Sequence, residues 1–244
     1  DFFNTHYNPK NVTVLIVGAI DHETAFKRVE HHFGAWQAQP RSEPTPQVEP
    51  ELTSRREETV RFATNTPLLL GGWKVPAAKH EDIVALKLLG KILSDGASSR
   101  MYRSLVYEQE LAQYAAGDVL TQVDNGQFYL WSAARPSVDI DQVEAAMLKV
   151  VEQVKKNGVT RSELKRAQAQ AEAESVAKLK KAHGIASLLG WSLMYHGDWR
   201  PALTELDRLR AVQPEDVQRV AKTYLAPDRM TVVKLLPEAK EVTP

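Results

Sequence analysis

The stretch from Gly90 to Gly117, together with the apolar helical pattern that starts at Ile83 and runs into it, constrains the fold of this chain more than any other. It begins with apolar residues at helical spacing and then reaches a Ser-Asp-Gly turn at 94–96. Ser98 and Ser99 follow, and their side-chain oxygens can cap the free N–H groups of a second helix. A strand-like run over 112–121 comes next. The sequence therefore predicts helix, turn, helix and strand in this order, and two core helices joined by a capped turn already explain the pattern.

The rest of the chain predicts an α+β fold. Further strands are expected over 59–75, 127–134 and 230–236. A strongly amphipathic helix over 139–156 ends at an Asn-Gly pair. A capping box formed by Thr160 and Glu163 then opens a long helix, which Gly184 is expected to break. This order favours a mostly antiparallel β-sheet with helices packed chiefly on one face.

The first 36 residues predict a short unit of their own. A continuous β-branched run over 12–17 suits a buried strand. Asp21 can cap the helix that follows, with Phe26 and Phe33 on its inner face. Residues 37–58 then carry four prolines among charged and hydroxyl side chains and almost nothing apolar. This composition indicates an extended, semi-rigid linker between two folded units.

Composition excludes several classes of function. The chain has 31 basic and 31 acidic residues, so no net field favours nucleic acid. No apolar run is long enough to span a membrane, and phosphate-loop and dinucleotide fingerprints are absent from the sequence. Cysteine is also absent, which excludes thiolate nucleophiles and thiolate metal ligands and permits either a periplasmic or a cytoplasmic setting.

Two strings resemble one enzyme family. Residues 92–113 read ILSDGASSRMYRSLVYEQELAQ. This string resembles the C-terminal half of the pitrilysin/insulysin-type zinc metallopeptidases, the inverzincins, in which a leucine-rich helix, a G-x-S-S-R-L-type turn and an L-R-E-x-x-G-L-A-Y-like helix end recur in this order. Residues 2–21 read FFNTHYNPKNVTVLIVGAID and resemble the closing segment of the N-terminal half of the same enzymes.

The resemblance implies three parts in this chain. Residues 1–36 correspond to the C-terminal tail of a preceding zinc-bearing half, 37–58 to a Pro-rich linker and 59–244 to a C-terminal pitrilysin-like domain. An internal echo agrees with this division, because 7–15 and 224–232 both run from a tyrosine through a proline turn into a β-branched strand containing Thr-Val. Pitrilysin-type enzymes are built as such tandem halves.

The zinc motif of this family is missing from the chain. It is H-x-x-E-H on a helix, where two histidines bind the metal and the glutamate activates water. None of the seven histidines has the required spacing, and Val84 stands where His80 and Glu81 would need a second histidine. We therefore expect no catalytic residue and no metal ligand in this chain. The resemblance places the zinc motif upstream of Asp1.

The resemblance also points to residues that face the substrate. In the family, an arginine and a tyrosine at the end of the helix contact the backbone of the bound peptide. The aligned residues here are Val106 and Gln113, which depart from that pattern. Tyr107, Gln109 and Tyr114 are nearby polar groups that could contact substrate, and a packing or surface role is the alternative for them.

These observations lead to one functional hypothesis and two rivals. The chain is interpreted as the C-terminal portion of a zinc-dependent metalloendopeptidase that encloses and cleaves unfolded peptides. Zinc is expected in the full-length enzyme. A paired subunit is expected to supply the missing arginine and tyrosine. One rival is a non-catalytic scaffold or assembly subunit of the same fold. The other is a peptide-binding module that offers a sheet edge to extended chains.

The chain by itself should bind no zinc tightly and cleave no peptide, because its histidines lack the required spacing and it has no cysteine. Elemental analysis after dialysis and an assay with an unstructured peptide would test this. Stoichiometric zinc together with peptidase activity that chelators abolish would contradict the prediction.

Overall fold

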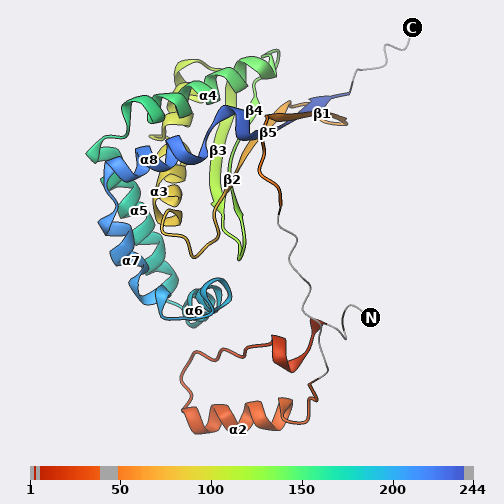
Figure 1. Ribbon diagram of the computed structural model, residues 1–244, viewed down its shortest axis with the longest axis vertical. Coiled ribbons are helices and arrows are strands. Elements are labelled where there is room, and N and C mark those ends of the chain that lie inside the picture. The colour runs from red at the N-terminus through yellow and green to blue at the C-terminus, as the bar shows by residue number, and fades with distance from the viewer. Residues whose placement is uncertain (1–2, 4–5, 39–48, 239–244) are drawn as a thin grey trace.

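A computed structural model of the chain describes residues 3, 6–38 and 49–238 (Figure 1). A five-stranded sheet has the order β1-β5-β2-β4-β3. Its strands are β1 (Arg56–Phe62), β2 (Leu68–Val75), β3 (Ala112–Leu120), β4 (Gly126–Ala134) and β5 (Met230–Pro237). Strands β1 and β5 run parallel, and the other neighbours are antiparallel. The predicted α+β fold with a mostly antiparallel sheet is confirmed.

The helices of the main body gather on one side of this sheet, as predicted (Figure 1). They are α3 (Ile83–Ser94), α4 (Ile140–Asn157), α5 (Arg161–Leu179), α6 (Ala182–His196), α7 (Pro201–Ala211) and α8 (Pro214–Tyr224). Three short turns of helix are η1 (Pro9–Asn11), η2 (Tyr102–Glu108) and η3 (Pro227–Arg229), and α2 (His22–Phe33) lies near the N-terminus. The main body thus forms two layers, and no helix among the described residues covers the other face of the sheet.

The core lies between the sheet and the helices. Side chains alternate along β2, so that Leu69, Trp73 and Val75 are buried against the helices whereas Leu70 is exposed. The Trp73 indole N–H donates a hydrogen bond to the Ala226 carbonyl oxygen at 3.0 Å, which satisfies the polar atom of this buried ring. The helix α3 contributes most of the opposing surface, because it is buried along nearly its whole length.

The turn between the first two core helices forms largely as predicted. The buried Ser99 hydroxyl accepts a hydrogen bond from the Tyr102 N–H at 3.4 Å and caps the second helix. Most of this helix has the wider π geometry over η2, which periodicity alone does not distinguish from an α-helix. Arg100, next to the cap, donates two hydrogen bonds to Glu163 at 2.7 and 2.9 Å and one to the Gly158 carbonyl at 3.0 Å.

One feature of the helical region forms as predicted and another differs from prediction. The predicted Thr160–Glu163 capping box is present at the start of α5. However, the break after α5 falls at residues 180–181 and not at Gly184. A Cβ atom on Gly184 would lie 1.9 Å from the Lys178 carbonyl oxygen, so this glycine allows the end of α5 to approach α6 closely.

The predicted strand over 12–17 does not form, and this prediction was wrong. The run is extended, pairs with no strand in the described residues, and leaves Val14 and Ile16 45% and 47% exposed. Its sequence counterpart in β5 is a strand because β1 and β2 flank it on both sides. The apolar face of α2 is likewise uncovered, with Phe26 75% exposed.

The predicted linker needs one correction. Of residues 37–58, those at 39–48 lie outside the described residues. The strand β1 begins at Arg56, so the last three residues of the predicted linker belong to the sheet. Arg56, Glu57 and Glu58 are charged, so their sequence shows no apolar pattern typical of a strand. They form a strand because the parallel neighbour β5 gives their backbone N–H and C=O groups hydrogen-bond partners.

The Arg100–Glu163 pair should make stability depend on pH. Hydrogen bonds from Arg100, aided by Thr160, hold the pKa of Glu163 at about 2, whereas the ordinary value is 4.5. Because the folded pKa is depressed, its contribution is fully present above about pH 4.5 and is lost as the pH falls toward 2. We expect Glu163→Gln to lower the free energy of unfolding by on the order of 2 kcal/mol at pH 7.

Urea unfolding of both proteins between pH 7 and pH 3 measures this effect, and the difference should shrink at the lower pH. Glu152→Gln is the matched control, because the exposed Glu152–Lys155 pair should contribute less than about 0.5 kcal/mol. An E163Q effect that stays constant across this pH range would contradict the assignment.

Candidate functional site

The face of the sheet that lacks helices is the first candidate surface, and we call it the open face. Residues directly opposite each other on neighbouring strands share a face. One row across this face joins Val233, Leu70 and Trp131. The next row joins Thr231, Gly72 and Tyr129. The open face therefore carries aliphatic and aromatic side chains around a central glycine.

A hollow of about 610 Å³ lies in the open face. Its lining residues include Leu70, Gly72, Tyr129, Thr231 and Val233 from three neighbouring strands. The segment before β1 also contributes, through Glu49 and Leu52. Lys74 holds this segment in place, because its ammonium group donates to the Glu49 carbonyl at 3.0 Å and lies 3.5 Å from the Glu51 carboxylate.

Two of the predicted substrate-facing residues lie where β3 begins. Gln113 is the extra residue of a β-bulge, since Ala112 and Tyr114 pair with consecutive residues of β4. The Gln113 side-chain amide donates to the Ala134 carbonyl at 3.0 Å. The bulge turns Tyr114 onto the open face, where its ring meets Trp131 edge to face at 4.6 Å between centroids. The structure thus connects Tyr114, but not Gln113, with the aromatic part of that face.

The other three predicted residues lie in or beside η2. Val106 is only 8% exposed and packs in the core, whereas Tyr107 is 77% exposed. The Gln109 side-chain amide donates to the Ser104 hydroxyl at 2.8 Å on the helix surface. As a result, η2 and the start of β3 present Tyr107 and Tyr114 to solvent and hide the Val106 side chain.

Sequence reasoning missed Arg135, which connects these two segments. Its guanidinium donates to the Val106 carbonyl at 3.3 Å and to the Ala112 carbonyl at 3.4 Å. It also lies 3.6 Å from the Glu110 carboxylate. Glu110 adopts a left-handed φ of 52°, at the position where the family pattern quoted above has glycine. Only the position of Arg135 just after a predicted strand could have indicated this role.

The described residues offer no metal site. Among residues 3, 6–38 and 49–238, no group of three His, Asp or Glu side chains could hold a metal ion. His80, part of the incomplete zinc-like string, accepts a hydrogen bond from the Asp82 N–H at 3.1 Å. The buried Asp82 carboxylate accepts hydrogen bonds from Arg219 and Tyr224 at 2.5 and 2.7 Å. Burial, followed by the bond to Asp82, raises the pKa of Tyr224 to about 12. Asp82 directly precedes α3, and Arg219 and Tyr224 belong to α8, so these hydrogen bonds join the two helices.

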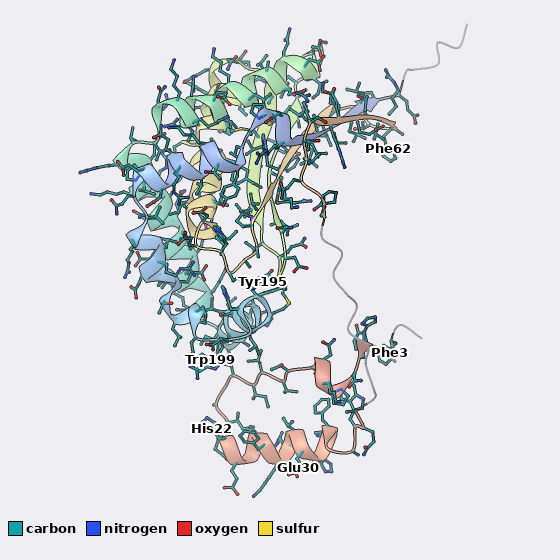
Figure 2. The ribbon with its side chains drawn as sticks, in the orientation of Figure 1. Phe3, His22, Glu30, Phe62, Tyr195 and Trp199 are labelled. Carbon is teal, nitrogen blue, oxygen red and sulfur yellow. The ribbon has the colours of Figure 1, made fainter. Side chains whose placement is uncertain are left out.

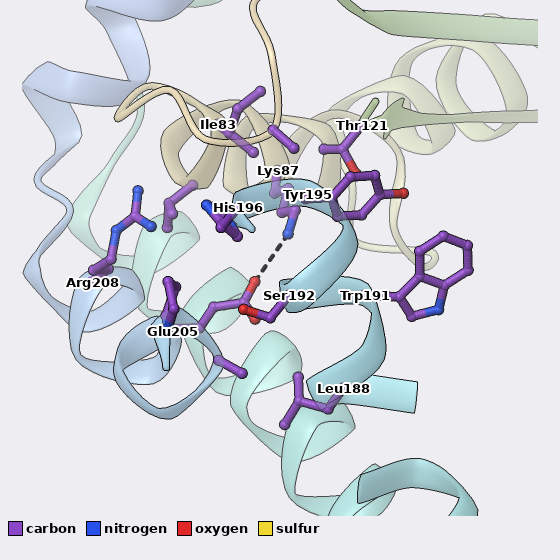
Figure 3. Close-up of a pocket in the computed structure, with 14 residues that line it drawn as sticks. Ile83, Lys87, Thr121, Leu188, Trp191, Ser192, Tyr195, His196, Glu205 and Arg208 are labelled. Atoms are coloured by element: carbon purple, nitrogen blue, oxygen red, sulfur yellow. Dashed lines mark hydrogen bonds and ion pairs between the residues drawn. The ribbon is translucent and has the colours of Figure 1, made fainter. Parts of the chain in front are cut away.

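A second, smaller pocket of about 110 Å³ lies between α3, α6 and α7 (Figure 3). Lys87 and Glu205 face each other across it and form an ion pair at 2.9 Å. Burial, followed by the positive charge of Arg208, lowers the pKa of His196. Ser192 lies one turn before His196, but its hydroxyl donates to the Asp198 carbonyl at 2.9 Å. The pocket therefore holds no serine–histidine pair arranged for nucleophilic catalysis.

Exposed aromatic side chains also lie away from both hollows. Figure 2 shows Phe62 at the outer end of the sheet, where it is 60% exposed, and Trp199 beside α6, where it is 43% exposed. No helix in the described part of the chain is long and apolar enough to cross a membrane.

Two adjacent glycines in β2 should respond oppositely to substitution. Gly71 faces the core, and a Cβ atom there would lie 3.0 Å from the Met147 methyl carbon, whereas one on Gly72 would meet nothing within 4 Å. Gly71→Val should lower the free energy of unfolding by about 1–3 kcal/mol through overpacking. Gly72→Val should leave it unchanged or raise it by up to about 1 kcal/mol, because valine suits a strand better. Urea unfolding of both variants tests the pair, and a large loss for G72V would contradict the open face.

Comparisons with known proteins agree with this architecture. The sequence profile described as the peptidase M16 inactive domain matches residues 1–171. Zinc protease PqqE of Helicobacter pylori is 28% identical over 240 residues, which cover 97% of this chain and 54% of that protein. The chain thus spans about half the length of the curated relatives it matches.

Solved structures give the same result. A protease from Helicobacter pylori superposes with a TM-score of 0.91 at 27% identity, covering 97% of this chain and 58% of that one. The peptidase M16 inactive domain from Pseudomonas fluorescens has a TM-score of 0.78 at 18% identity, covering 91% and 52%, and supports the fold alone. The family profile matches more than half of the sequence. The resemblance to pitrilysin-type zinc peptidases is therefore confirmed, and the chain belongs to the peptidase M16 family as an inactive domain.

Proposed function

We propose that this chain is the half without zinc of a zinc-dependent metalloendopeptidase, and that its open face forms one wall of a chamber enclosing unfolded peptides. The observation that carries the proposal is a sheet with one face packed by helices, while the other face carries Trp131 and a hollow lined by Leu70 and Tyr129. An extended peptide can lie on such a face and bury apolar side chains there. The similarity to a protein named as a zinc protease supports the reaction class.

Zinc would be held by another part of the complete protein. Three or four protein ligands are needed for a catalytic zinc site, and the described residues provide no such group. When bound elsewhere, zinc would supply the activated water for hydrolysis. The contribution of this chain would be to hold the peptide in an extended form and exclude bulk water around it.

We further propose that residues 1–36 belong to the preceding half and 59–244 form the inactive domain. The support is the exposed apolar run over 12–17. Its sequence counterpart in the inactive domain is β5, which lies between β1 and β2. An equivalent pair of flanking strands in the preceding half would give its N–H and C=O groups partners and cover its side chains. The exposed face of α2 would be covered by the same body.

Among the predicted substrate-facing residues, Tyr114 is the one best placed for this role. It lies on the open face against Trp131, and the residue is 39% exposed. Tyr107 is accessible from the adjoining surface of η2, whereas Val106 and Gln113 have side chains that are buried or bonded to this chain. We therefore assign peptide contact to the two tyrosines.

The complete polypeptide that contains this chain tests the proposal directly. It should retain zinc after dialysis and cleave an unstructured peptide in a reaction that chelators abolish, while this chain alone should do neither. A complete polypeptide without zinc and without activity would favour the scaffold alternative.

Full activity should also require a second polypeptide. Val106 and Gln113 lack the guanidinium and phenol that hold the peptide in the resembling family, and neither residue can replace the bidentate donors of an arginine. Turnover of an unstructured peptide should rise at least about tenfold when the product of the neighbouring gene is added, as expected for one charged hydrogen bond. Equal turnover without the partner would contradict the paired arrangement.

The partner's arginine gives a matched comparison. Its replacement by alanine should abolish the gain, whereas Gln113→Ala in this chain should change turnover little, since that amide bonds the Ala134 carbonyl and not the substrate.

A further inference from the structure

Strand β2 carries two adjacent glycines in the middle of the sheet, and only one of them is explained by packing. A Cβ atom on Gly71 would lie 3.0 Å from the Met147 methyl carbon and 3.3 Å from the Met230 sulfur. Gly71 therefore makes room for two methionines of the core. A Cβ atom on Gly72 would meet nothing within 4 Å. Neither glycine has a positive φ, so the backbone does not require glycine at either position.

Gly72 lies at the centre of the open face. Its strand is the third of five, and its direct neighbours on that face are Thr231 and Tyr129. Glycine within a strand lowers stability by about 0.5–1 kcal/mol relative to alanine and often marks a place where a ligand approaches the backbone. The missing side chain of Gly72 opens the floor of the hollow. The glycine therefore has a cost in stability, and packing against the described residues gives no reason for it.

The walls of the hollow indicate what it can hold. Leu70, Val233 and Tyr129 provide apolar and aromatic surface. The charge of Lys74 is already engaged by the Glu49 carbonyl and the Glu51 carboxylate. Glu49 itself lines the hollow and would repel an anion. Gln122, Asn125 and Gln127 also line the hollow and add uncharged polar groups. The apolar part of the lining suits an uncharged, apolar side chain, and the volume of about 610 Å³ lies within the range of small-ligand pockets, about 300–1,000 Å³.

We propose that the hollow over Gly72 is a specificity pocket that receives one large apolar side chain, aromatic or leucine-like, of an extended peptide lying on the open face. This inference rests on the proposed function and adds the class of residue that the peptide must carry. Tyr129 packs against the bound side chain, and the absence of a side chain on Gly72 lets it reach the sheet. The hollow therefore selects peptides that carry a large apolar side chain, and it does not select them by charge.

Peptide titrations followed by NMR of the ¹⁵N-labelled chain test the pocket. The probes are short Gly/Ser peptides that differ only at one central residue, which is Phe, Glu or Gly. The Phe peptide should shift the amide signals of Gly72, Tyr129 and Thr231 and bind about tenfold more tightly than the Gly peptide, as expected for burial of one aromatic ring.

Two valine variants separate the pocket from the rest of the face. Gly72→Val fills the floor of the hollow and should remove the preference for Phe. Ala116→Val places a valine side chain opposite Trp131 on the same open face, outside the residues that line the hollow, and should keep that preference. Thermal unfolding of both variants confirms that they are folded before the titrations are compared.

The outcomes distinguish this inference from the proposed function. Equal binding of the three peptides, or a preference that survives in G72V, overturns the pocket and leaves peptide binding by the open face intact. Binding of none of the peptides contradicts both proposals. If sedimentation shows that the wild-type chain self-associates and G72V does not, a second copy and not a peptide fills the hollow, and the inference is wrong.

Discussion

The position of β5 is the constraint on which the rest of this fold depends. The last strand in the sequence lies between β1 and β2, so the first and second strands of the domain meet only through it. Lys234 in β5 is only 8% exposed and joins Glu57 of β1 to Asp141 and Glu144 of α4, at 2.6, 2.6 and 3.1 Å. Burial alone would lower the pKa of Lys234, but the hydrogen bonds to these carboxylates raise it. Loss of one partner would leave a buried charge unpaired, so this cluster ties sheet and helix layer together.

Under the proposed function, the sheet divides its two faces between stability and peptide binding. On the helix side, Gly71 yields space to Met147 and Met230, and the packing is tight. On the other side, Gly72 leaves a hollow in a row of apolar and aromatic residues. Because successive residues of a strand point to opposite faces, one Gly-Gly pair serves both purposes. This arrangement permits a stable domain to keep an apolar surface accessible to a peptide.

The candidate site was predicted in part, and the reason lies in the backbone. The resemblance directed attention to Val106 and Gln113, which align with the arginine and tyrosine of the family. A bulge at Gln113 shifts the alternation by one residue, so Tyr114 and not Gln113 reaches the open face. Arg135, more than 20 residues further along the chain, connects η2 to the start of β3 through hydrogen bonds to the Val106 and Ala112 carbonyls. Neither the bulge nor a contact of this kind has a signal in local periodicity.

Local interactions were enough to determine the helices, the caps and the fold class. The Thr160–Glu163 box, the Ser99 cap and the amphipathic pattern of α4 depend on residues within a few positions of one another. Strands depend on distant neighbours, and this is why the β-branched run over 12–17 stays exposed while the charged residues of β1 form a strand. The open face and its hollow also arise only in the tertiary structure, since Gly72, Tyr129 and Thr231 come together through the register of three strands far apart in the sequence.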